Sequence, residues 1–303
     1  MKISAARIEK LPNDKRIWHY TSPEVLWKLL SGEFYATHYR FMNDSAEIIY
    51  GTERFANFLE TVESLKYLSF VIQELRVQDY FLLCFSEDSD NLYHWRSYAS
   101  KGGFSIGFSY NKMCDLLNKQ EIDEAEGKIL NYDLVQCQYP EDKTPDSFMH
   151  KEMEVFESIM EKWSPEERLF LGQSFAEVKA GRCPDIAAFF RERSPDFCDS
   201  FLKVIFGTER IRSRCPAFKD PSFAVEKEYR LVITGEDLRS QVELIGNKPR
   251  IKIPIPELSQ CIEEVCVSPH GDVEQNHLLA EIARERFGLD FEIYRSKSTF
   301  NGK

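Results

Sequence analysis

The chain has 303 residues, of which 43% are hydrophobic and 13% aromatic, enough for the core of one large domain or two of ordinary size. Fifty acidic and thirty-nine basic residues give a net charge of −11, which disfavours nonspecific adhesion to nucleic acid but leaves room for a local basic site. No apolar run approaches the roughly 20 residues of a membrane span. The first residues also lack a signal peptide's apolar run, so we expect a cytoplasmic protein.

The eight cysteines form no CxxC pair and show no histidine spacing typical of a zinc site. Most of them stand singly inside apolar runs, as small buried hydrophobic residues do. The sequence therefore predicts reduced thiols and no metal site.

The first clear element is "RIWHYTSPEVLWKLLSG", residues 16–32. Its first letters predict a short buried strand. Ser22 or Thr21 can cap the helix that follows, and Gly32 stands where a left-handed C-terminal cap would be. His19 lies where the strand gives way to the helix, and loops at strand ends carry function more often than strand centres do. The alternative is a histidine that makes one structural hydrogen bond beneath the helix.

The next elements alternate between strand and helix up to about residue 147. "FYATHYRFMND" predicts a strand and a turn, and helical spacing follows to about residue 77. "YFLLCFS" has the length and composition of a buried strand. After Gly102 and Gly103 break the chain, Phe104, Ile106 and Phe108 alternate as in a half-buried strand.

The second half of the chain begins with a helical stretch. Residues 148–206 are rich in Glu, Lys, Ala and Phe, with helical spacing interrupted by prolines, and we expect a helical insertion within a single domain of residues 1–303. Strands then return in "KEYRLVI", "QVELI", "RIKIPI" and "EEVCVSP". A helix over residues 273–287 and a strand "FEIYR" complete the chain. Strands first and last with helices between them predict an α+β fold.

The common catalytic motifs are absent, since the chain has no P-loop, GxGxxG, HExxH or GxSxG. Polar residues instead stand at predicted strand ends: His19, Asn43 with Asp44, Ser86, Trp95 with Tyr98, and Glu226 with Glu228. These positions are the candidates for chemistry.

The glutamates of "FAVEKEYRLVI" are separated by one residue, which predicts that Glu226 and Glu228 point to the same face at the start of a strand. Two like charges so close would raise the pKa of one of them unless a cation or a substrate intervenes. The alternative is an edge strand whose solvated glutamates pair with Lys227 or Arg230.

Several motifs together resemble the bacterial domain-of-unknown-function family two-nine-seven-one. They are "HYTS" before a short helix, "MND" with Glu47 shortly after, "CFSEDSDNLYHWRSY" leading to "GGFSIGF", and "FKDPSFAVEKEYRLV" followed by "IPIPELSQCIEEVCVSP". The resemblance covers most of the chain outside the helical middle.

A more distant resemblance links the chain to DarT-like ADP-ribosyltransferases. "WHYTSPEVLWKLLSG" is similar to their opening strand with its histidine, "FLLCFSEDSDNLY" to their next apolar strand, and "KEYRLVI" to the strand that begins with their catalytic glutamate. This resemblance implies a split-sheet fold and NAD as the substrate. It would place His19 on the ribose of NAD and make Glu228 the catalytic acid residue.

The physical chemistry of that reaction suits these residue types. Cleavage of the nicotinamide–ribose bond passes through an oxocarbenium-like state, which a nearby carboxylate stabilises. A histidine can hold a ribose hydroxyl, and an aromatic ring, here Tyr98 or Trp95, can stack on nicotinamide. We expect the NAD-binding residues at the same strand ends, namely His19, Tyr20, Thr21, Ser86 and Trp95, with Glu228, His19 and Tyr98 as the catalytic set.

The expected acceptor site lies beside the catalytic glutamate. A Glu-x-Glu pair resembles that of arginine-modifying ADP-ribosyltransferases, in which the first acid, here Glu226, orients the acceptor. Upstream, "TERIRSRCPAFKDPSF" brings Arg212, Arg214 and Lys219 close to an aromatic residue, which suits contacts to phosphates and bases. The alternative is a solvated loop that happens to hold basic residues.

These observations favour an NAD-dependent ADP-ribosyltransferase that modifies RNA or DNA. A cytoplasmic enzyme of this kind would poison its own cell, so we expect a toxin or antiphage-defence effector held by an inhibitory antitoxin or chaperone protein. The open alternatives are a protein (arginine) ADP-ribosyltransferase, an NAD glycohydrolase, and a noncatalytic nucleotide-sensing or interaction protein.

Overall fold

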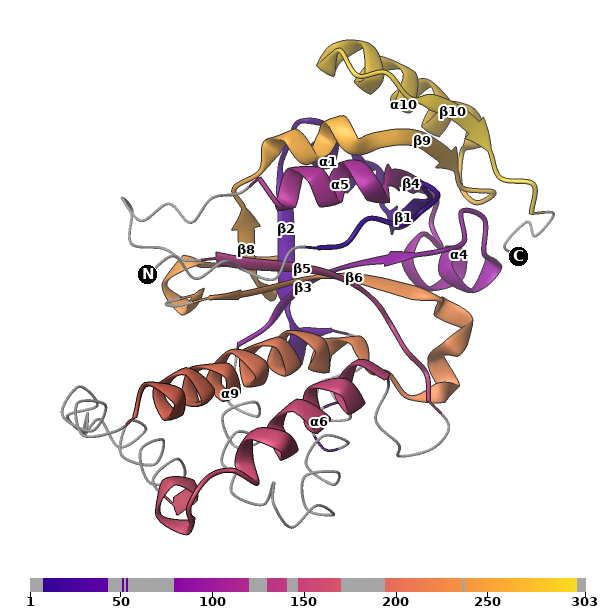
Figure 1. The fold of residues 1–303 in the computed structure, drawn as a ribbon. Helices are drawn as coiled ribbons and strands as arrows, with labels where there is room; N and C mark the ends of the chain where they lie inside the picture. The colour runs from indigo at the N-terminus through magenta and orange to yellow at the C-terminus, as the bar shows by residue number, and fades with distance from the viewer. Residues whose placement is uncertain are drawn as a thin grey trace. The chain divides into compact units, whose positions relative to one another are not determined.

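The computed structural model describes residues 8–42, 51, 53, 79–119, 130–140, 147–169, 194–235 and 238–298 (Figure 1). The chain divides into two compact units. The first unit comprises Met1–Asp44, Asp79–Gln138 and Ser222–Lys303, and the second comprises Ser45–Gln78 and Tyr139–Pro221. The predicted positions Asp44 and Glu47 lie outside the described residues, as does Asn43.

The first unit is built on a ten-stranded mixed sheet in the order β10-β9-β4-β1-β3-β2-β8-β7, with β6 paired to β3 and β5 paired to β6. Only the β9–β10 pair is parallel among the described strands. The strands are β1 (Arg16–Thr21), β2 (Phe34–His38), β3 (Phe81–Ser86), β4 (Phe104–Ser109), β5 (Leu130–Gln136), β6 (Glu228–Gly235), β7 (Val242–Ile245), β8 (Lys248–Ile253), β9 (Ile262–Val267) and β10 (Glu292–Arg295). The predicted α+β class is therefore confirmed.

The sheet branches at β3. On one edge, β3 pairs with β6 along its whole length, from Phe81 to Ser86. Its other edge is divided, because β2 pairs with Phe81 and Leu82 at one end while β1 reaches only Ser86 at the other. The backbone of Cys84 lies between these two pairings. Figure 1 shows β3, β5 and β6 running together away from β1 and β4.

Helices cover one face of this sheet around a large apolar core. They are α1 (Pro23–Leu30), α5 (Tyr110–Leu117) and α10 (Val273–Phe287), and they contribute side chains such as Leu26, Met113 and Ala280 to the same buried cluster as the strands. Alternate residues of the strands point into it, among them Ile17, Phe34, Ala36, Phe81, Leu83, Phe85, Leu231, Ile233, Ile251 and Ile253. Packing in this core fixes the positions of β1, β3 and β6, which carry His19, Ser86 and Glu228.

The first helix begins and ends as its sequence predicts. Ser22 Oγ accepts a hydrogen bond of 3.4 Å from the backbone of Val25, and Pro23 is the first helical residue. Gly32 follows the helix with φ +84°, and a Cβ there would lie 2.8 Å from Pro256. A side chain would be strained by both the dihedral angle and the contact.

A smaller aromatic cluster lies beneath α4 (Leu92–Tyr98). It consists of Trp18, Tyr20, Trp95, Ala99 and Cys266, with Tyr294 packed against it. The Tyr20 and Trp95 rings are 4.8 Å apart and edge-to-face. The seven cysteines among the described residues are free thiols.

The described part of the second unit is helical. It contains α6 (Ser147–Met160), α9 (Pro195–Arg214) and a short 3-10 helix, Cys215–Ala217. Between α6 and α9, Trp163 stacks on Phe201 at 6.1 Å and donates its Nε1 hydrogen to Ser200 Oγ at 2.9 Å. This contact fixes the two helices against each other.

Candidate functional site

Three strands bring distant residues into one row at the branch of the sheet. Trp18 of β1 lies opposite Ser86 of β3, and Ser86 lies opposite Glu228 of β6. The backbones of β1 and β6 are therefore about 10 Å apart at this row. Glu228 and the strand that carries His19 thus lie on either side of Ser86.

The two glutamates do not lie on one strand, contrary to the prediction. Glu226 is the last residue of a 3-10 helix, Pro221–Glu226, and Glu228 begins β6. Lys227 between them has φ +43°, which breaks the alternation of an extended strand. Both glutamates are 5% exposed, so they are not solvated, but the pairing of a glutamate with Arg230 that the alternative included is present.

Glu228 is bound by a buried arginine of its own strand. Arg230 donates from Nε to Oε1 and from Nη2 to Oε2, each at 2.9 Å, and it has no exposed surface. This bidentate geometry is the strongest form of ion pair between these side chains. It holds the carboxylate of Glu228 in one orientation.

Glu226 is positioned by a tyrosine and a serine. The Tyr93 hydroxyl donates to Oε1 of Glu226 at 3.0 Å, and Ser86 Oγ donates to its backbone oxygen at 2.9 Å. Ser86 Oγ also accepts from the backbone of Asp88 at 3.2 Å. The predicted ligand-binding residue Ser86 is thus engaged with the protein itself and shapes the loop that carries Glu226.

His94 of α4 lies near enough to both carboxylates to be affected by their charges, and no sequence motif singled it out. Burial lowers the pKa of His94, although neighbouring carboxylates, Glu226 first among them, raise it. Its Nδ1 is buried and has no hydrogen-bond partner among the described residues. Its ring lies 4.8 Å from the Tyr20 ring and 5.9 Å from the Tyr98 ring.

His19 has a different environment. Its Nδ1 lies 2.8 Å from the backbone oxygen of Cys84 in the gap between the β1 and β2 pairings, and because that oxygen only accepts, Nδ1 must donate. Burial lowers the pKa of His19, the contact with Cys84 raises it, and the charge of Arg250 lowers it further. Since neutral histidine has one N–H, Nε2 keeps a lone pair that can accept a ligand hydroxyl.

Two of the expected ligand-binding aromatic residues are part of the core. Trp95 has no exposed surface and donates its Nε1 hydrogen to Asp90 at 2.6 Å, so its ring cannot stack on a ligand. The Tyr20 hydroxyl donates to the Asp88 backbone at 2.8 Å and accepts from Asn91 at 2.9 Å. Burial raises the pKa of Tyr20 well above its ordinary value.

The remaining two predicted residues of this region differ in exposure. Thr21, at the end of β1, is buried. Tyr98 is 41% exposed at the end of α4, and Tyr93 on the same helix is 38% exposed. Of the two aromatic residues proposed to stack on nicotinamide, Tyr98 is therefore the accessible one.

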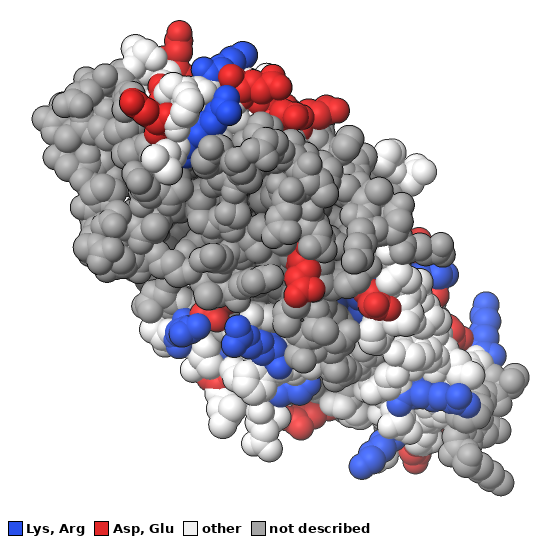
Figure 2. Space-filling model, turned by 90° about the horizontal axis from the view of Figure 1, so that it is seen from below, with Lys and Arg blue, Asp and Glu red and all other residues white. Residues whose placement is uncertain are grey.

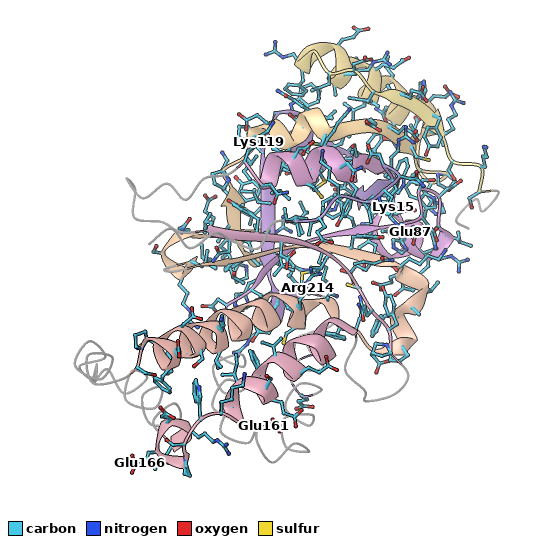
Figure 3. The ribbon with its side chains drawn as sticks, viewed as in Figure 1. Lys15, Glu87, Lys119, Glu161, Glu166 and Arg214 are labelled. Carbon is cyan, nitrogen blue, oxygen red and sulfur yellow. The ribbon has the colours of Figure 1, made fainter. Side chains whose placement is uncertain are left out.

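A lysine lies beside this site. Lys15 Nζ is 3.1 Å from Oε1 of Glu87, and Figure 3 shows the two side chains pointing toward each other. The same Nζ lies 4.7 Å above the ring of Tyr229, the residue after Glu228. Across the loop, Lys227 pairs with Asp88 at 3.2 Å.

The expected acceptor residues do not form an exposed basic loop. Residues up to Arg214 belong to α9 and not to a loop, and the side chain of Arg212 lies outside the described residues. Arg214 is half-buried and Lys219 is 3% exposed, so Lys219 is not available to a phosphate in this structure. Figure 2 shows Lys and Arg beside Asp and Glu on the described part of the face that it presents.

The described ranges hold no group of three or more His, Cys, Asp or Glu side chains that could bind a metal ion. They also hold no helix with the length and hydropathy needed to cross a membrane. The site therefore consists of carboxylates, histidines, tyrosines and cations from the first unit.

Comparisons with known proteins give one match. No curated protein matches the chain, and no solved structure does. Residues 94–231 match the model of a family described as "Protein of unknown function (DUF2971)". The matched range contains the "HWRSY", "GGFSIGF" and "EKEYRL" motifs, and the resemblance to this family is therefore confirmed over that part of the chain.

Proposed function

We propose that the protein is an NAD-dependent ADP-ribosyltransferase whose reaction centre is the pair Glu226 and Glu228. The observation that carries the proposal is the burial of two carboxylates one residue apart in the chain, the first of which accepts a hydrogen bond from the exposed Tyr93 of α4. A carboxylate in such a setting stabilises positive charge more strongly than it does in water.

The proposed reaction begins at the bond between the ribose C1′ and the nicotinamide nitrogen. The bonding electrons leave with the pyridinium nitrogen, which makes nicotinamide neutral, and the ribose becomes an oxocarbenium ion. Glu228, fixed by Arg230, stabilises this cation. An acceptor nucleophile then bonds to C1′, and its proton passes to Glu226, which Tyr93 holds by a hydrogen bond.

The branch of the sheet supports the proposed binding of the donor. His19 sits in the gap where β1 leaves β3, with Nδ1 turned to Cys84 and a lone pair left on Nε2. In the proposal, Nε2 accepts a hydrogen bond from a ribose hydroxyl. Tyr98, the exposed aromatic residue, stacks on nicotinamide. A split-sheet fold like that of ADP-ribosyltransferases is part of this proposal.

The acceptor and the biological role complete the proposal. We keep RNA or DNA as the acceptor, and a toxin or antiphage-defence effector with an inhibitory partner as the role. The first test is incubation of the purified protein with NAD labelled in its adenylate part, with total RNA, single-stranded DNA and cell extract offered separately. Released nicotinamide is measured in the same samples.

The comparison sets wild type against Glu226→Gln and Glu228→Gln, with Glu257→Gln as the control because Glu257 is an exposed glutamate outside the site. We expect label transfer by wild type and by the control, and loss of transfer in both site variants at a temperature where circular dichroism shows them folded. Nicotinamide release without labelled acceptor would identify a glycohydrolase. Folded wild type that neither cleaves NAD nor transfers label would refute the proposal.

A further inference from the structure

Three cations follow one another on a single face of β8. In "KPRIKI", Lys248, Arg250 and Lys252 occupy alternate positions, while Ile251 and Ile253 point into the core. Alternate residues of a strand share a face. Successive cations are therefore about 6.6–6.8 Å apart, and the row spans about 13 Å.

These three side chains form no ion pair or hydrogen bond within the part of the chain that the structure describes. Most of the other described lysines and arginines of the first unit pair with a carboxylate, as Lys227 and Arg239 do. Arg250 is the most telling of the three. It is half-buried, and its Nε has no partner although that atom is out of contact with solvent. A buried donor without a hydrogen-bond partner lowers the stability of the folded protein, and an anionic ligand that accepted its hydrogen bond would offset this cost.

The neighbouring strands add one aromatic residue and one opposing charge. Tyr35 of β2 lies opposite Lys252, and Thr37 lies opposite Arg250, so both share the face of the cations. On the other side, Glu243 of β7 lies opposite Arg250 but is exposed and forms no ion pair with it in the described structure. Among the described residues of β2, β7 and β8, this face carries three positive charges and one negative charge.

We propose that Lys248, Arg250 and Lys252 bind successive phosphates of a single-stranded nucleic acid, with Tyr35 as a stacking surface for a base. A row of evenly spaced cations along one strand fits a linear polyanion better than a single phosphate group. An aromatic ring beside such a row is the combination by which proteins bind single strands without reading their sequence. In a chain of net charge −11 this row is a local exception.

The row lies close to the proposed donor site. Arg250 is near enough to His19 for its charge to lower the pKa of that histidine. The claim that the row is the acceptor site of the transferase rests on the proposed function. The claim that the row binds single-stranded nucleic acid rests on the residues of β8 and its neighbouring strands alone. It also replaces the acceptor site expected at Arg214 and Lys219, where the structure buries the lysine.

The test is fluorescence anisotropy of a fluorescein-labelled single-stranded RNA oligonucleotide, measured without NAD over a series of KCl concentrations. The proteins are wild type, Lys248→Gln, Arg250→Gln and Lys252→Gln, with Lys101→Gln as the matched control because Lys101 is exposed and lies outside the row. We expect severalfold weaker binding for each row variant. We also expect the slope of log K against log salt to fall by about 0.7 for each phosphate that the variant no longer binds.

Three results would overturn the inference: no binding by wild type, an equal loss in Lys101→Gln, or equally tight binding of the same sequence as a duplex. Arg250 is half-buried, so Arg250→Gln could weaken binding by disturbing the fold. Lys252 is exposed, so a loss of binding in Lys252→Gln does not have that cause. NAD cleavage is measured separately, without RNA. RNA binding through the row without NAD cleavage would support this binding site and refute the transferase. NAD cleavage with labelled protein and no RNA binding would support the transferase and refute this binding site.

Discussion

Removing the carboxylate of Glu228 should destabilise the protein as well as its proposed chemistry. Glu228→Gln leaves Arg230 charged and fully buried but removes the negative charge beside it and one of the two hydrogen bonds of 2.9 Å, because the amide nitrogen of Gln cannot accept. Breaking a buried ion pair from one side costs about 3–5 kcal/mol. The one charge-assisted hydrogen bond that is lost outright contributes roughly 1.5–3 kcal/mol of this cost. We therefore expect a loss of about 3–5 kcal/mol in the free energy of unfolding.

The measurement is urea unfolding followed by circular dichroism for wild type, Glu228→Gln, Arg230→Met and the double variant. Because the double variant buries no uncompensated charge, it should be more stable than the sum of the single effects predicts, by about 2 kcal/mol. Glu257→Gln, at an exposed glutamate, should unfold like wild type. A Glu228→Gln variant within about 1 kcal/mol of wild type, with additive effects in the double variant, would refute this account of the pair.

Three further results are expected. Trp95→Phe should lower the free energy of unfolding in urea by about 1–2 kcal/mol, because the hydrogen bond to Asp90 is removed, while NAD cleavage stays unchanged. Glu243→Gln should tighten binding of single-stranded RNA in the anisotropy assay, since it removes a negative charge on the strand next to the cation row. Burial lowers the pKa of His94 and of His19, so stability should fall as the pH drops below their ordinary value of 6.5, by up to about 1.4 kcal/mol per unit for each histidine. His94→Gln should make urea unfolding less dependent on pH between 7.5 and 5.5.

Each of these expectations has an opposite outcome. If Trp95→Phe is stably folded but cleaves NAD more slowly, Trp95 contributes to the reaction site. Weaker RNA binding by Glu243→Gln would mean that the carboxylate supports the row instead of opposing it. An unchanged pH dependence in His94→Gln would mean that this histidine titrates alike in the folded and unfolded protein.

Local signals predicted the elements that local interactions decide. Ser22 and Gly32 mark the two ends of α1 because a side-chain oxygen and a missing Cβ act within a few residues of their own position. The apolar run "YFLLCFS" likewise became β3, which is buried along nearly its whole length. Such features need no knowledge of the distant chain.

The glutamate pair shows where local reasoning fails. An alternating pattern in "VEKEYRLVI" favours one continuous strand, but Lys227 adopts φ +43° and divides it. The backbone of Lys227 accepts from Glu87 at 3.0 Å and that of Glu228 from Cys137 at 2.8 Å. These contacts come from segments far away in the sequence. The conformation of Lys227 is thus decided by tertiary contacts that no local pattern contains.

The face of α4 was equally undetermined by sequence. "LYHWRSY" has aromatic residues on every side, so its periodicity cannot say which rings are buried. The structure buries His94 and Trp95 and leaves Tyr93 and Tyr98 exposed. The buried tryptophan meets Trp18 and Tyr20 of β1, and this contact depends on how α4 packs against that strand.

The cation row of β8 depends partly on local sequence and partly on contacts with distant strands. Its alternation is visible in the letters "KPRIKI", yet the same letters describe an ordinary solvated strand face, which is the commonest setting for lysine and arginine. What separates the two interpretations is the register with the strands on either side. It places Tyr35 and Thr37 along one edge and a single carboxylate, Glu243, along the other. Because one carboxylate cannot neutralise three cations, the described residues of these three strands leave a surplus of positive charge, and this surplus is the reason for proposing a ligand with several negative charges.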